Sequence, residues 1–203
     1  MKKLSALLIS VIAVFVYFPA FSQTNLIGPP NGLEYGMTYS EAKTTLKSKG
    51  IKLEKLKREK KYKLPKGFKV AKVGKYKILE RKTDPNLAVF NADGELCSFR
   101  IVFRFSDSKF EEARTKGVTY YVNNLRKALL AKYSGEGFKE HKDPDADGNA
   151  PDLAFRDEVG NELGVYHQTK KELIGHSYFI VVYYNNEEIL TARRKEQKST
   201  DKL

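Results

Sequence analysis

The chain has 203 residues, with 37 Lys and Arg, 25 Asp and Glu, and a single cysteine, Cys97. This length suits one domain with its own hydrophobic core, and a lone cysteine excludes an intramolecular disulfide. The net charge of +12 is uneven, because residues 41–82 contain 17 Lys and Arg against four Asp and Glu.

The N-terminal end has the order of a secretory signal peptide. Two lysines precede an uncharged apolar run over residues 4–18, Pro19 interrupts that run, and Ala20 and Ser22 supply the small residues that a signal peptidase requires. We therefore expect cleavage before Gln23, which predicts a periplasmic or secreted protein with no transmembrane segment after cleavage. An uncleaved membrane anchor is the alternative, because the run is close to the ~20 residues that span a bilayer.

The first helix has clear start and stop signals. Residues 23–36 are rich in Pro and Gly, which predicts an extended lead-in. Thr38 and Glu41 have the spacing of a capping box, in which each side chain bonds the other residue's backbone amide. Gly50 is typical of a helix end, so the sequence predicts a helix between Thr38 and Gly50.

Three strands are predicted after this helix. Alternation begins at Phe68 and is firm over residues 76–83, a second strand covers 87–90, and a turn over 91–94 leads into the third. The third strand has five apolar side chains that alternation places on one buried face: Cys97, Phe99, Ile101, Phe103 and Phe105. Cys97 is therefore predicted to be a small core side chain rather than a reactive thiol.

The second half follows the same order. A helix is predicted from Ser108, which forms a capping box with Glu111, to Gly135, and a polar loop covers 136–151. Three more strands are expected, at about 153–157, 162–168 and 177–184.

Runs of strands between helices are typical of an α+β fold. The sequence predicts two helix-plus-three-strand meander units that form an antiparallel sheet with the helices packed on one face. The predicted organisation is a signal peptide over 1–22, the lead-in over 23–36, one domain over 37–186 and a charged tail over 187–203. The tail is expected to be a frayed helix or disordered.

Two segments suggest a resemblance. Residues 35–42 (YGMTYSEA) resemble the helix opening of many small exported bacterial domains, and residues 125–133 (LRKALLAKY) are similar to their second helix. The β-lactamase-inhibitor-protein-like fold and the small outer-membrane assembly lipoproteins share this layout. The resemblance covers roughly residues 35–185, without the lipidated cysteine of the lipoproteins. It implies a non-enzymatic binding or structural module and names no partner.

The basic segment over 41–82 predicts an anionic partner. In an exported protein this partner is an anionic envelope component or an acidic protein, and nucleic acid is disfavoured because few aromatic residues interleave with the lysines. The residues predicted to contact it are Lys55, Lys57, Arg58, Lys60 and Lys61. The alternative is a solvated lysine-rich face that only keeps the protein soluble.

A second alternative is a calcium-dependent interaction protein. Oxygen ligands recur at every second position in the acidic loop, with Gly148 sixth, as in the first half of a calcium-binding loop. The candidate ligands are Asp143, Asp145, Asp147 and Asn149. Ala154 stands where the twelfth position requires a bidentate glutamate, which favours a plain acidic surface loop.

No catalytic motif is present, so the sequence predicts a protein that is not an enzyme and needs no cofactor; a hydrolase with an unrecognised site stays open. The three histidines, at 141, 167 and 176, lack the spacing of a zinc site. His167 is in phase with Leu163 and Val165, which predicts a packed strand histidine.

Overall fold

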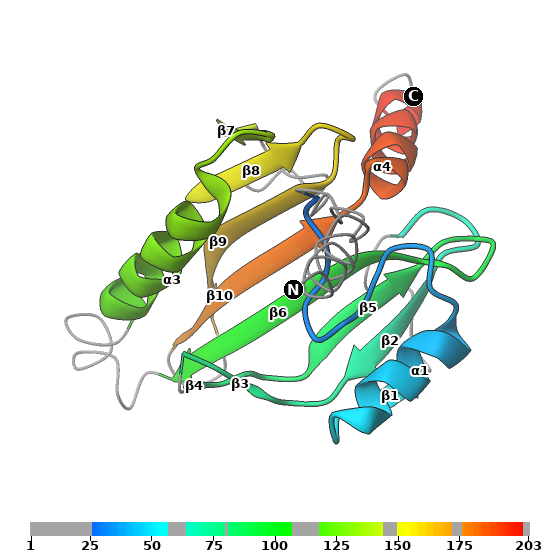
Figure 1. Ribbon diagram of the computed structural model, residues 1–203, viewed down its shortest axis with the longest axis horizontal. Coiled ribbons are helices and arrows are strands. Elements are labelled where there is room, and N and C mark those ends of the chain that lie inside the picture. The colour runs from blue at the N-terminus through cyan, green and yellow to red at the C-terminus, as the bar shows by residue number, and fades with distance from the viewer. Residues whose placement is uncertain are drawn as a thin grey trace, which may run out of the picture.

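The computed structural model describes residues 26–56, 64–79, 81–106, 118–143, 150–171 and 176–200. The helices are α1 (Tyr39–Ser48), α3 (Val118–Tyr133) and α4 (Glu187–Thr200), as Figure 1 shows. The strands are β1 (Leu53–Lys55), β2 (Lys69–Val73), β3 (Lys77–Ile78), β4 (Arg81–Lys82), β5 (Asn86–Phe90), β6 (Leu96–Ser106), β7 (Phe138–His141), β8 (Leu153–Asp157), β9 (Glu162–Lys171) and β10 (His176–Asn185).

Eight of these strands form one antiparallel sheet in the order β1-β2-β5-β6-β10-β9-β8-β7, so the fold is α+β as predicted. The chain leaves β6 at the centre, passes through α3 to β7 at the far edge, and returns strand by strand to β10. Each half of the chain contributes four strands to the sheet, not the predicted three. The two edge strands, β1 and β7, are only three and four residues long, too short to show alternation in the sequence.

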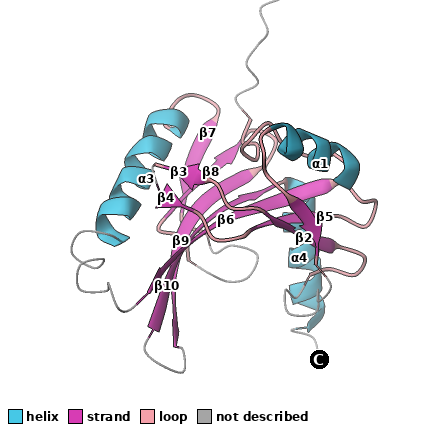
Figure 2. Cartoon of the chain, turned by 90° about the horizontal axis from the view of Figure 1, so that it is seen from below, coloured by secondary structure: helices cyan, strands magenta, loops and turns pink. Residues whose placement is uncertain are grey.

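The helices cover both faces of the sheet, so the predicted packing on one face is wrong. Figure 2 shows α1 and α3 on one face and α4 on the other. Leu46 of α1 and Leu125 of α3 belong to the main core with Phe103, whereas Ile189 and Leu190 of α4 pack in a second cluster. Residues 187–200 form a helix that buries Ile189 and Leu190 of its first turn, because this apolar pair lies against the sheet, while Glu187 and Glu188 stay exposed.

Cys97 is fully buried, as predicted, but it lies on the opposite face from Phe99. The reason is a β-bulge: Phe90 pairs with Leu96 and Val89 pairs with Ser98, so the register between β5 and β6 skips Cys97. A bulge shifts the alternation by one residue, so Cys97 enters the cluster beneath α4. Its carbonyl accepts a hydrogen bond from the Asn186 amide at 2.9 Å, at the start of α4.

The alternating stretch over 76–83 is a hairpin of two short strands, β3 and β4, rather than one strand. Leu79, between them, has a φ of 46°, which turns the chain. The Thr83 amide donates to the Tyr76 carbonyl at 2.8 Å and closes the hairpin base. Alternation gave no sign of the turn, because leucine is uncommon in the left-handed region.

The described part of the lead-in, from residue 26, forms hydrogen bonds with distant parts of the chain. Ile27 is fully buried, and its amide donates to the Asp157 carboxylate at 2.8 Å. Further along, the Gly36 amide donates to the Leu96 carbonyl at 2.9 Å. These bonds fix the position from which α1 begins.

The predicted signal peptide and the predicted capping box at Ser108 lie outside the described residues. None of the helices in the described ranges is long and apolar enough to cross a membrane.

Four tyrosines make the fold sensitive to alkali. Burial is the main cause that raises the pKa of Tyr35, Tyr76, Tyr121 and Tyr184 above the ordinary value of 10.0. The unfolded chain ionises these phenols from pH 10 upward and the folded chain does not, so the contribution of these four phenols to stability is constant below pH 10 and falls above it. In a titration followed by tyrosinate absorbance and circular dichroism, we expect these phenols to ionise together with unfolding. Smooth ionisation of every tyrosine with the fold intact would contradict this.

Candidate functional site

A recess with a volume of about 410 Å³ opens between the C-terminal end of α1 and β1. It is lined by Lys43, Lys47, Gly50, Ile51, Lys52, Leu53 and Glu54. This volume lies at the lower end of the range for small-molecule sites.

The end of α1 shapes this recess. The Gly50 amide donates to the Lys47 carbonyl at 3.0 Å and the Ile51 amide donates to the Leu46 carbonyl at 2.9 Å, which is the Schellman pattern. Gly50 has the positive φ, 69°, that this ending requires. A Cβ at Gly50 would meet no atom within 4 Å, so the space beside this residue is open.

The lysines of the recess come from two elements. Tyr39, Lys43 and Lys47 are spaced by four residues and therefore follow one side of α1. Lys52 precedes β1, and all three recess lysines are exposed. Among the described residues, none of these three ammonium groups forms an ion pair. The one acid of the recess, Glu54, pairs in register with Lys72 of β2.

Lys55 is the only predicted anion-binding residue among those described; Lys57, Arg58, Lys60 and Lys61 lie outside them. Its Nζ lies 5.2 Å from the centre of the Tyr39 ring, a cation–π arrangement. The Tyr39 hydroxyl donates to the Leu53 carbonyl at 3.1 Å, which ties α1 to β1. We define the lysine face as Lys43, Lys47, Lys52 and Lys55.

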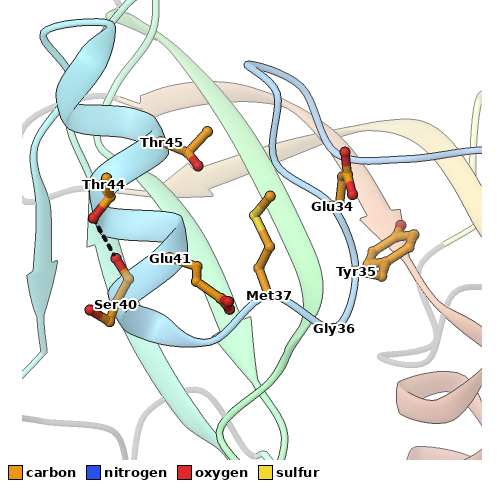
Figure 3. Close-up of a pocket in the computed structure, with 8 residues that line it drawn as sticks. All are labelled: Glu34, Tyr35, Gly36, Met37, Ser40, Glu41, Thr44 and Thr45. Carbon is orange, nitrogen blue, oxygen red and sulfur yellow. Dashed lines mark hydrogen bonds between the residues drawn. The ribbon is translucent and has the colours of Figure 1, made fainter.

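A second hollow, with a volume of about 600 Å³, lies between α1 and the lead-in (Figure 3). It is lined by Glu34, Tyr35, Gly36, Met37, Ser40, Glu41, Thr44 and Thr45. Several polar groups that line this hollow already form hydrogen bonds within the protein. The Thr38 amide donates to Glu41 at 2.8 Å, which confirms the predicted capping box and lowers the pKa of Glu41. The Thr44 hydroxyl donates to the Ser40 carbonyl at 3.0 Å.

Of the predicted calcium ligands, only Asp143 is described; Asp145, Asp147 and Asn149 lie outside the described residues. The Asp143 carboxylate lies 3.6 Å from Arg156 Nη2 and 3.6 Å from His141 Nδ1. It therefore faces cationic and imidazole groups. Within the part of the chain that the structure describes, no three His, Cys, Asp or Glu side chains gather as a metal site.

Asp143 is the outer member of a charged cluster that the sequence did not predict. Glu162 has a side chain only 2% exposed, and its carboxylate lies 2.9 Å from Arg156 Nη2 and 3.4 Å from His141 Nε2. Arg156 and Glu162 are opposite each other in the register of β8 and β9. The turn at residues 157–161 was the available signal, because opposite charges flanking a hairpin turn face each other across it.

His167 is not packed, contrary to prediction. Its side chain is 66% exposed, and Nδ1 lies 2.8 Å from an Asp152 carboxylate oxygen. The periodicity correctly placed His167 on the same face as Val165. Alternation in the sequence predicts which face of a strand a side chain is on. It does not predict how far along the strand other elements cover that face.

No protein family, curated protein or solved structure that was compared matches this chain. The resemblance of residues 35–42 and 125–133 to exported domains therefore stays a prediction.

Proposed function

We propose that the protein is an exported, non-enzymatic binding module that contacts an anionic surface of the cell envelope through the lysine face. The observation that carries this proposal is the clustering of Lys43, Lys47 and Lys52 around one recess, with no ion pair to a described acid. Lysines that serve only solubility are usually interspersed with acids. Here one segment contains the whole basic excess.

The expected affinity follows from the charge. Near an anionic membrane each lysine contributes about 1 kcal/mol, so three together change the partition coefficient on the order of 100-fold. Ions shorten the reach of these charges to about 8 Å at physiological salt. Binding should therefore weaken steeply as salt is added.

Co-sedimentation with lipid vesicles tests the proposal. The mature protein should bind vesicles that contain phosphatidylglycerol, bind those of pure phosphatidylcholine far less, and be released by salt. The triple variant Lys43→Gln, Lys47→Gln, Lys52→Gln should lose most of this binding.

The matched control removes the same charge from elsewhere. Arg126, Lys127 and Lys139 are exposed on α3 and β7, at the other end of the sheet. Their triple glutamine variant should bind nearly as the native protein does. Equal loss in the two variants would mean that net charge alone drives binding, and no binding at low salt would refute the proposal.

The calcium alternative has less support. Asp143 already faces Arg156 and His141, so a cation there would compete with a guanidinium group. Calorimetric titration of the metal-free protein with calcium would revive that alternative if it released heat below millimolar concentrations.

A further inference from the structure

The recess beside the lysine face combines two chemistries. Ile51 and Leu53 are 9% and 5% exposed and supply apolar side chains, and Gly50 contributes no side chain at all. The stems of Lys43 and Lys47 add four methylenes each, while lysine ammonium groups in such positions keep to water. The inner lining is therefore hydrocarbon and the rim is cationic.

A purely polar anion would use only half of this arrangement. Phosphate or an acidic sugar would contact the ammonium groups and leave the hydrocarbon lining in water. A neutral apolar ligand would use the lining and leave the rim charges without a counter-charge. A ligand with a short alkyl segment joined to an anionic head matches both parts.

We propose that the recess holds the first part of an acyl chain from an anionic envelope lipid, whose head group lies between Lys43, Lys47 and Lys52. This inference rests on the proposed function and adds to it, because it names the ligand class and a pocket rather than a charged surface. Glu54 keeps the rim at two net positive charges, which suits a head group with one or two negative charges.

Gly50 provides a specific test. Asparagine tolerates the left-handed region better than other residues with a side chain, and a Cβ at Gly50 meets nothing within 4 Å, so Gly50→Asn should fold. Because Gly50 lines the recess, the added side chain would take up space at its wall and leave every lysine in place. Gly94→Asn is the matched control, because Gly94 has a φ of 87° and equally open surroundings in a distant turn.

The measurement is the titration of isotopically labelled protein with dodecyl phosphate below its micelle concentration, followed by amide chemical shifts. We expect saturable shifts at Gly50, Ile51 and Leu53. Inorganic phosphate should leave Ile51 and Leu53 unmoved, and dodecyl maltoside should bind more weakly. Gly50→Asn should weaken dodecyl phosphate binding about tenfold, the loss of about two buried methylenes, and Gly94→Asn should not.

The outcomes separate the two proposals. If the native protein binds phosphatidylglycerol vesicles but dodecyl phosphate leaves the recess amides unmoved, the proposed function stands and this inference is wrong. Unchanged affinity in Gly50→Asn would also overturn it. If dodecyl phosphate binds in the recess but vesicles do not bind, the surface proposal fails and the recess is a site for free amphiphiles.

Discussion

Replacing Gly164 with alanine is expected to lower the free energy of unfolding by about 3 kcal/mol, because the added methyl group has no room. Gly164 of β9 pairs in register with Tyr183 of β10, and the tyrosine ring lies across the glycine. A Cβ at Gly164 would lie 2.6 Å from Tyr183 Cε1 and still closer to its Cζ and hydroxyl oxygen. Tyr183 is 1% exposed, so the ring cannot move aside without disturbing its cluster with Tyr166.

The control is Gly135→Ala, just after α3. A Cβ there would meet nothing within 4 Å, and the backbone is not in the left-handed region. This variant should change stability by less than about 0.5 kcal/mol. Urea unfolding of both variants measures the difference. Native stability in Gly164→Ala would mean that Tyr183 does not lie over β9.

Replacing Glu162 with alanine should cost about 3 kcal/mol, near the lower end of the values for breaking a buried ion pair. The carboxylate is the inner partner of Arg156, and removing it takes the buried negative charge away from Arg156 and His141 while the exposed Asp143 stays beside them. The loss stays near the lower end because the Arg156 side chain is 30% exposed, so water hydrates part of the charge that is left.

Two further variants separate the ion pair from general effects on the sheet. Glu140→Ala removes an exposed carboxylate from β7 and should change stability by less than about 0.5 kcal/mol. Replacing both Arg156 and Glu162 with methionine removes both charges, so it should cost less than Glu162→Ala alone. A double variant less stable than the single one would contradict the account of this cluster.

The sequence predicted those features that depend on neighbouring residues. The capping box at Thr38 needs two side chains three residues apart, and the end of α1 near Gly50 and the turn at Gly94 each need a glycine in the left-handed region. Such signals are complete within the local sequence, so tertiary packing did not override them.

Features that depend on distant segments were missed. The bulge at Cys97 forms where α4 begins, and the Asn186 amide that bonds its carbonyl is far away in sequence. The alternating pattern of residues 97–105 contains no information about a hydrogen bond to Asn186. The position of α4 on the opposite face was also missed, because Ile189 and Leu190 are the only buried residues among its described side chains and they stand in a charged segment.

The candidate site shows the same division. Composition located the basic segment, and Lys55 is one of its predicted contact residues. The recess was not predictable, because it forms only where the end of α1 meets β1. Lys43 and Lys47 are candidate site residues because they line the recess at that junction, and the local density of lysines alone did not single them out.

Lysine footprinting tests the central claim, that the lysine face binds an anionic surface, most directly. The rate at which each lysine is acetylated would be measured with and without vesicles that contain phosphatidylglycerol. The account predicts slower acetylation at Lys43, Lys47, Lys52 and Lys55, with Lys127 and Lys139 unchanged. Equal slowing at all lysines, or slowing confined to Lys127 and Lys139, would contradict it.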